Sequence, residues 1–141
     1  MSIKNIFGIA GTAMNAQTIR MNTTASNLAN AGTIAGSEED AFRAKRSVFK
    51  ALVDQQDLNR GFEHLGGVKV AEIVDDQAPV RKIYDPTNPA SDAEGYMYAS
   101  NVSEVTEMVE MIAASRSYQN NVEVVTTARQ LMLKTLDLTK V

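Results

Sequence analysis

The C-terminal stretch constrains the fold more than any other part of the sequence. From Val102 to Val141 it contains no glycine and no proline, so nothing in it interrupts a helix. Its apolar residues recur at a spacing near 3.5, which is typical of a helix in coiled-coil-like packing. This seam comprises Val105, Met108, Val109, Ile112, Val122, Val125, Met132, Leu133 and Leu136.

The helix that this seam predicts is too long for a small globule. We predict a helix over residues 101–139, with Asn101 as its N-cap and Glu104 completing a capping box. Such a helix is about 58 Å long, whereas a compact chain of 141 residues has a radius of gyration of about 14 Å. The apolar seam therefore needs a partner outside the globule. The first candidate is the N-terminal segment, and the second is a copy of the same or a related chain.

The N-terminal segment also has helical spacing, but its apolar stripe is thin. Gly8 and Gly11 each lower the helix propensity by about 1 kcal/mol relative to alanine. Many members of the stripe are small, which allows a neighbouring helix to approach closely. We predict a helix that depends on partners for its stability. Its apolar positions recur every three or four residues and include Ile3, Ile6, Ala10, Ala13, Met14, Met21, Ala25, Leu28 and Ala31.

The same segment has some features of a targeting sequence. Lys4 precedes the apolar stretch Ile6–Met14, as in a short signal peptide. Two glycines and a threonine dilute that stretch, and Met14-Asn15-Ala16 is a poor cleavage site, so we expect no cleaved signal. The absence of acidic residues before Glu38 is also typical of mitochondrial presequences, but those are richer in arginine. No stretch approaches the roughly 18 apolar residues of a membrane span.

The middle of the chain has the pattern of short strands separated by turns. Glycines and prolines punctuate it, and Asp75-Asp76 and Asp85–Pro89 are typical of turns. The sequence therefore predicts an α+β fold in three segments: residues 1–34, a β-rich middle of residues 35–100, and residues 101–141. The predicted strands are Phe42–Val53, Val68–Val74, Val80–Tyr84 and Tyr96–Ala99.

The sequence offers little chemistry. It has no cysteine and one histidine, His64, which lies in a glycine-flanked loop and is expected at the surface. Oxygen-bearing residues from Asp85 to Glu94 depart from the spacing of a calcium-binding loop, with two prolines among them. The basic cluster Arg43, Lys45 and Arg46 is expected to be solvated or to face a neighbouring subunit. We predict no catalytic residues, no metal site and no cofactor. A net charge of −3 argues against nucleic acid as a partner.

Several motifs, taken in order, resemble one protein family over nearly the full length. The stretch Ser26-Asn27-Leu28-Ala29-Asn30-Ala31-Gly32-Thr33 resembles the asparagine-rich turn that follows the N-terminal helix of flagellar axial proteins, which form the rod and hook. Later stretches resemble a rod member of that family in the same order. They are Phe42–Arg46 with Phe49, Gly67–Val70, Pro79–Pro86, Asp92–Tyr98, Glu107–Ile112, Ala114–Tyr118 and Gln119–Val124.

The resemblance implies a structural subunit of the proximal part of the flagellar rod. In this family the terminal helices pair as an inner coiled-coil-like layer, and the middle forms an outer, β-containing segment. The rod crosses the periplasm, transmits torque and encloses an export channel, and its subunits leave the cell by the flagellar type III apparatus without a cleaved signal. The implied partners are other copies, other rod proteins, and neighbouring ring and export-gate components.

We predict that the assembly interface lies on both terminal helices. Asn15, Asn22, Thr23 and Ser26 either line the channel or form hydrogen bonds between subunits, and the sequence does not separate these roles. The predicted interface residues are Ile6, Leu28, Asn30, Ile112, Tyr118, Val122, Leu133 and Leu136.

One departure from the family pattern leaves a loop undefined. Many members have Thr-Pro-Gly and an aromatic residue after the asparagine turn, whereas Thr33 is followed here by Ile-Ala-Gly-Ser-Glu-Glu-Asp. The conformation of residues 33–41 is therefore open.

Two other classes of protein also remain open. A soluble helical adaptor or secretion chaperone would be a stable dimer with ordered termini, and a small hydrolase is disfavoured because no nucleophile–base pair is present.

Overall fold

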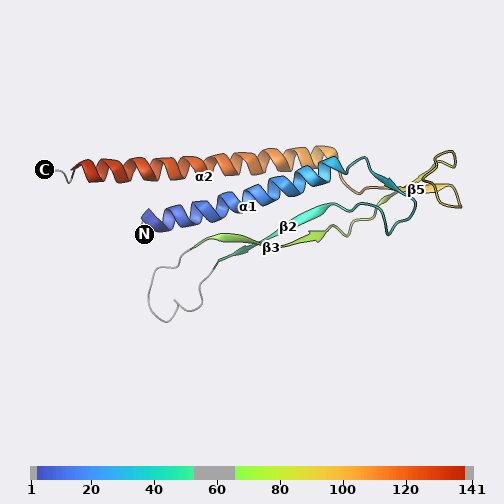
Figure 1. Ribbon diagram of the computed structural model, residues 1–141, viewed down its shortest axis with the longest axis horizontal. Helices are drawn as coiled ribbons and strands as arrows, with labels where there is room; N and C mark the ends of the chain where they lie inside the picture. Colours follow the sequence, from blue (N-terminus) through green and yellow to red (C-terminus); the bar gives the residue numbers. More distant parts are fainter. Residues whose placement is uncertain (1–2, 53–65, 139–141) are drawn as a thin grey trace, which may run out of the picture. The chain divides into compact units, whose positions relative to one another are not determined.

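The computed structural model describes residues 3–52 and 66–138. In the order of the described chain, a helix comes first, short strands follow, and a second helix comes last (Figure 1). This order confirms the α+β prediction. The elements are α1 (Ile3–Ala29), β1 (Ile34–Ala35), β2 (Lys45–Ala51), β3 (Val68–Asp75), β4 (Arg81–Tyr84), β5 (Tyr96–Ala99) and α2 (Glu104–Leu138).

The chain divides into two compact units. Unit 1 comprises the described parts of residues 1–19, 48–72 and 113–141, and unit 2 comprises residues 20–47 and 73–112. Both helices and strands β2 and β3 contribute a segment to each unit. Within each unit the segments of α1 and α2 run antiparallel (Figure 1).

Helix α1 ends at the asparagine-rich turn, as predicted. The side-chain amide of Asn30 donates to the carbonyl oxygen of Ser26 at 2.8 Å and so satisfies a carbonyl of the last turn. The backbone N–H of Asn30 donates to the same carbonyl at 3.2 Å. The hydroxyl of Thr33 then donates to the carbonyl oxygen of Asn30 at 2.7 Å, which closes the turn.

The helix predicted over residues 101–139 is observed as α2 (Glu104–Leu138). Its predicted N-cap, Asn101, is wrong. Ser103 is the N-cap, because its hydroxyl oxygen accepts from the N–H of Thr106 at 3.5 Å and its carbonyl accepts from the N–H of Glu107 at 3.0 Å. Asn101 instead joins two other segments. Its side-chain oxygen accepts from the N–H of Ala44 at 2.7 Å, and its amide donates to the carbonyl of Ala78 at 2.9 Å.

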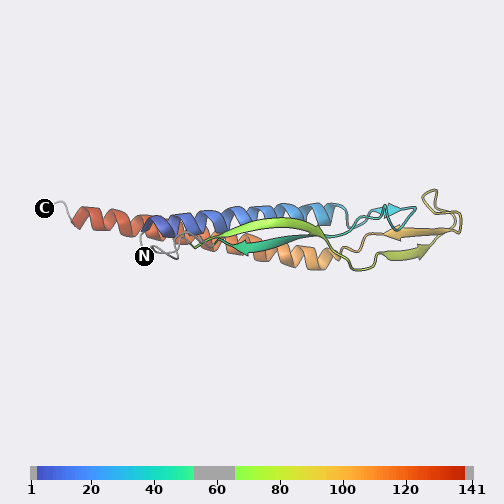
Figure 2. The same ribbon diagram turned by 90° about the horizontal axis from the view of Figure 1, so that it is seen from below.

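Three of the strands form an antiparallel sheet in the order β1-β5-β4. Figure 2 shows β4 and β5 running side by side. Strand β5 matches its prediction, and β4 begins one residue after the predicted Val80. Strand β1 was not predicted; it pairs Ile34 with Ala99 and so gives the loop of residues 33–41 a defined start. Gly95, before β5, has a φ of 83°, and a Cβ there would meet the Tyr84 ring at 3.0 Å.

The other two strands, β2 and β3, pair with each other and lie against α1 (Figures 1 and 2). In unit 1 the N–H of Val68 donates to the Thr12 hydroxyl at 3.3 Å. Strand β2 is shorter than predicted at its start. Phe42 precedes it and packs against a small cluster of Ala31, Ala44 and Val102, and the predicted end, Val53, lies outside the described residues.

Small side chains dominate the buried interior. They allow the elements to approach closely, as the sequence of α1 predicted. Most large apolar side chains of α2 are left at the surface, which is unusual for a chain that folds alone. The buried apolar residues are Ala10, Ala16, Ala31, Ala41, Ala44, Met97, Ala99, Val102, Ala114 and Ala128.

Candidate assembly surface and polar clamp

A buried carboxylate joins three elements of unit 2. Glu107 of α2 is 0% exposed, and each of its oxygens has a partner. Oε1 accepts from Nη1 of Arg46 on β2 at 2.6 Å, and Oε2 accepts from the side-chain amide of Asn27 on α1 at 2.9 Å. We call Asn27, Arg46 and Glu107 the polar clamp.

Asn27 supplies the geometric precision of the polar clamp. It is 0% exposed and binds both backbone groups of Lys45. Its amide donates to the carbonyl of Lys45 at 2.9 Å, and its side-chain oxygen accepts from the N–H of Lys45 at 2.8 Å. This two-sided contact imitates strand pairing, so it fixes where β2 begins relative to α1. The asparagine of the sequence motif is therefore a positioning residue inside the chain.

Charges around the polar clamp are paired. Burial alone would lower the pKa of Arg46, but hydrogen bonds and charge from Glu107 and Asp76 outweigh it and raise that pKa above its ordinary value. The N–H of Ala78, followed by Arg46, lowers the pKa of Asp76 against the opposing effect of burial. These contacts therefore favour the charged forms of Arg46 and Asp76.

A second ion pair in unit 2 joins Arg20 of α1 to Glu110 of α2. It lies one turn beyond Glu107 along α2 and about two turns from Asn27 along α1. These two polar contacts tie α1 to α2 at two places within this unit.

Arg46 of the basic cluster has a partner that the sequence did not predict. We expected Arg43, Lys45 and Arg46 to be solvated or to face a neighbour. Arg46 instead binds the buried Glu107 within the chain. Lys45 is exposed and pairs with Asp75 at 3.1 Å, and Arg43 reaches the carbonyl of Ala78 at 3.2 Å. The pattern of charges in sequence did not reveal that a glutamate of the last helix turns inward.

The described residues contain no arrangement with obvious reaction chemistry. No group of three or more His, Asp or Glu side chains within residues 3–52 and 66–138 lies close enough to hold a metal ion. His64 lies outside the described residues. In that same described part of the chain, no helix is both long and apolar enough to cross a membrane.

Helix α2 carries an unusual amount of exposed apolar surface. Aliphatic side chains along it are between 41% and 80% exposed. Exposed apolar area on this scale marks an interaction surface. The exposed apolar residues of α2 are Val105, Met108, Val109, Ile112, Val122, Val124, Leu131, Leu133, Leu136 and Leu138.

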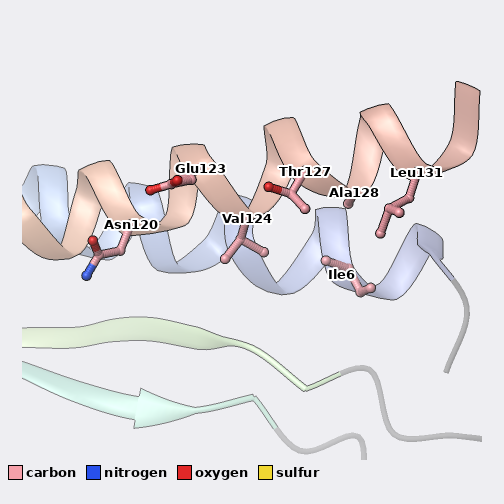
Figure 3. Close-up of a pocket in the computed structure, with 7 residues that line it drawn as sticks. All are labelled: Ile6, Asn120, Glu123, Val124, Thr127, Ala128 and Leu131. Atoms are coloured by element: carbon pink, nitrogen blue, oxygen red, sulfur yellow. The ribbon is translucent and has the colours of Figure 1, made fainter. Parts of the chain in front are cut away.

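In unit 1 part of this surface is hollowed into a groove of about 470 Å³. Figure 3 shows Ile6 on α1 opposite the α2 residues that form the rest of the wall. Val124, Ala128 and Leu131 make it mainly apolar. Three polar residues, Asn120, Glu123 and Thr127, complete the lining. The groove has the chemistry of a site for an apolar side chain or helix rather than for a charged ligand.

The structure distributes the predicted interface residues between two environments. Ile112, Val122, Leu133 and Leu136 are between 41% and 53% exposed. The other four, Ile6, Leu28, Asn30 and Tyr118, are half-buried, with Ile6 lining the groove and Asn30 capping α1. Their role in assembly remains a prediction.

Sequence reasoning missed the two large apolar groove residues of α2, Val124 and Leu131. Both lie off the 3.5-residue seam, which drifts around a helix of 3.6 residues per turn. A second apolar row, at positions 124, 131 and 138, is present in the sequence and indicates these residues.

The two ends of the chain match models of one class of protein. Residues 7–33 match the family model described as flagella basal body rod protein. Residues 93–138 match the one described as flagellar basal body rod FlgEFG protein C-terminal. These matches cover most of α1 and all of α2, the two helices held in register by the polar clamp. The fold and the matches together define a flagellar basal-body rod protein.

Comparison with individual proteins is more specific. The flagellar basal-body rod proteins FlgC of Yersinia enterocolitica and Salmonella typhimurium are each 49% identical over 138 residues, which is 98% of this chain and 98% of theirs. FlgC of Buchnera aphidicola from Acyrthosiphon pisum is 44% identical over 142 residues. The chain belongs to the FlgC family and is a structural subunit of the flagellar basal-body rod. The alternative of an adaptor or secretion chaperone has no support from these relatives.

Proposed function

We propose that this chain forms part of the proximal rod, the drive shaft that transmits torque and encloses the export channel. The observation that carries the proposal is the row of exposed apolar side chains on α2 of a rod-family chain. Burying one such side chain contributes about 1.5–3 kcal/mol. A rod subunit has neighbours that can supply this burial, whereas a solitary chain does not.

The proposed partners are other copies of the chain, other rod proteins, and adjoining ring and export-gate components. The proposed location is the rod within the periplasm, reached through the flagellar type III apparatus without a cleaved signal. Binding to neighbours would offset the entropy cost of ordering the N-terminal helix, whose apolar stripe is thin. The interface residues would be the eight predicted above, with Val124 and Leu131 added from the groove.

The three segments of the chain have different proposed roles. Residues 1–34 and 101–141 form the inner core shared across the family, and residues 35–100 determine which neighbours the subunit meets. Replacing residues 38–100 with those of another rod protein should move the chimera or block rod assembly. Normal rods with the chimera in its original position would refute this division of roles.

We also propose that the chain is not an enzyme and uses no cofactor. The relatives are named as rod proteins. The charged residues of the polar clamp are engaged with one another and hold α1, β2 and α2 together.

The test of the proposed function is complementation. A strain lacking this chain should make basal bodies without a complete rod and should not swim, and the wild-type gene should restore both. Electron microscopy of isolated basal bodies, with the chain labelled, should place it in the proximal rod. Complete rods in the deletion strain would contradict the proposal.

A further inference from the structure

Two asparagines of unit 2 hold neighbouring residues at the start of β2. Asn101, which precedes α2, accepts from the N–H of Ala44 at 2.7 Å through its side-chain oxygen. Asn27 of α1 accepts from the N–H of Lys45 at 2.8 Å and donates to the carbonyl of Lys45 at 2.9 Å. The next residue along the chain is Arg46, the arginine of the polar clamp. The chain is therefore tied to α1 and to the segment leading into α2 immediately before that arginine.

Ala44 is enclosed by these contacts. It is 0% exposed, and its carbonyl accepts from the N–H of Asp76 at 2.7 Å. The side-chain amide of Asn101 donates to the carbonyl of Ala78 at 2.9 Å and to that of Asp76 at 3.3 Å. A buried backbone N–H that loses its acceptor destabilises the fold. The oxygen of Asn101 is thus needed to keep Ala44 where it is.

The first two turns of α2 offer three carboxylates at equal spacing. Glu104, Glu107 and Glu110 stand three residues apart, so each is displaced from the next by about 4.5 Å along the helix. Of the three, only Glu107 is buried. Because hydrogen-bond lengths vary by only about 0.5 Å, the position of Arg46 decides which carboxylate it meets.

We propose that Asn101 is a positioning residue that selects Glu107 as the carboxylate of the polar clamp. Arg46 follows Ala44 by two residues of extended chain, about 6.6 Å, so a fixed Ala44 limits where the backbone of Arg46 can lie. Asn101 does for the segment before α2 what Asn27 does for α1. It acts through the backbone of Ala44 and Arg46 rather than on Glu107 itself.

The positioning role has a consequence for the subunit. Residues 35–100 are the segment for which we propose the choice of neighbours, and Asn101 ties the start of β2 within that segment to the last helix. A loosened tie would leave this segment poorly placed for its neighbours. This consequence rests on the proposed function, whereas the position of Arg46 can be measured in the purified chain alone.

The direct test follows the guanidinium protons of Arg46 by NMR in the purified full chain. In the wild type these protons should exchange slowly with water, because Nη1 donates to a buried carboxylate. Asn101→Ala should abolish the slow exchange and make Arg46 resemble the exposed Arg116. The matched control is Asn88→Ala, which removes an acceptor from the N–H of Ala90 in the same unit and should leave the Arg46 signal unchanged.

A second variant keeps the test decisive if Asn101→Ala does not fold. Asn101→Asp retains an acceptor for the N–H of Ala44 and loses the amide that donates to Ala78. Slow exchange of the Arg46 protons should persist in this variant. Its loss in Asn101→Asp, or its persistence in a folded Asn101→Ala chain, would overturn the proposal.

A double-mutant cycle then tests whether Asn101 acts through the polar clamp. The unfolding equilibrium constant is measured in urea for Asn101→Ala, Glu107→Gln and the double variant. The combined loss of stability, as a fold-change, should be smaller than the product of the two single losses by at least about twofold. Single losses that simply multiply would show that the two residues act independently and would overturn the proposal. Both measurements use the purified chain, so they stand whether or not the wild-type chain is found in the proximal rod.

Discussion

The two units of this chain join the same pair of helices with different chemistry. In unit 2 a buried carboxylate, an asparagine and an arginine fix α1, β2 and α2 in one register. In unit 1 the described helices carry alanines at their buried positions and an open apolar groove. Polar contacts specify geometry at little net gain in stability, whereas apolar surface stabilises whatever covers it. Unit 2 is thus held in register by contacts within the chain, whereas in unit 1 the apolar groove between the helices is left open.

The largest expected effect separates assembly from folding. Leu133→Asp places a charge at a position that is half exposed in the chain, so the free energy of unfolding of the isolated chain should change by less than about 0.5 kcal/mol. In the rod the same charge would be desolvated in every copy. We expect a soluble chain, no complete rods and no swimming, measured by motility and by recovery of basal bodies.

The control for this prediction is Gln130→Asp, an exposed polar position one turn away on the same helix. It introduces the same charge without removing an apolar side chain, and its effect on motility should be milder. Full motility of Leu133→Asp at normal expression would show that this part of α2 is not an assembly surface.

A second prediction concerns folding of unit 2. Asn27→Ala removes three hydrogen bonds and leaves the buried carboxylate of Glu107 short of a partner. We expect the free energy of unfolding to fall by about 3 kcal/mol, measured by urea denaturation of the purified chain. The matched control is Asn22→Ala on the exposed face of α1, which should change stability by less than about 0.5 kcal/mol. Equal effects of the two variants would show that the polar clamp does not stabilise unit 2.

The third prediction compares two stretches of one helix. Residues 21–29 of α1 lie in unit 2 beside the polar clamp, and residues 5–18 lie in unit 1. Isolated helices of this composition are marginal, with Gly8 and Gly11 in the weaker stretch. In the free chain we expect amide hydrogens of residues 5–18 to exchange faster than those of residues 21–29. Uniform protection along α1 in a monodisperse monomer would contradict the contrast between the units.

The smallest expected effect is a dependence on pH. The N–H of Ala78 and, after it, Arg46 lower the pKa of Asp76 in the folded chain. Because the folded pKa is depressed below the ordinary value of about 3.9, this contribution is present above about pH 4 and is lost as the pH falls through the folded pKa. Asp76→Asn should therefore lose less stability than wild type between about pH 5 and pH 3. Parallel acid curves for the two chains would show that Asp76 does not contribute in this way.

The regular elements of the fold were largely predictable from the sequence. Helical periodicity located both helices, and alternation with turn residues located β5 to the residue. The caps were harder, because Asn101 and Ser103 are both good N-cap residues and only tertiary contacts decide between them. Asn101 is engaged with Ala44 and Ala78, so Ser103 caps the helix.

The polar clamp was not predictable by the same reasoning. A glutamate near a helix N-terminus is adequately explained by the helix dipole, so nothing in the sequence marked Glu107 as buried. Its partners Asn27 and Arg46 are far from it along the chain, and their contact is a property of the antiparallel helix pair. The side chains at positions 112, 122, 133 and 136 belong to the predicted seam, and the structure leaves them exposed. Their role in the rod remains a prediction.

We propose that neighbouring subunits cover the apolar surface of α2 in the rod. The most direct measurement is the reactivity of a single thiol, since the natural chain has none. Leu131→Cys lies in the groove of unit 1 and is exposed in the free chain. We predict rapid labelling by a maleimide in the purified chain and strong protection of the same thiol in isolated basal bodies, read from this chain by mass spectrometry. Labelling at the same rate in both states would contradict the account.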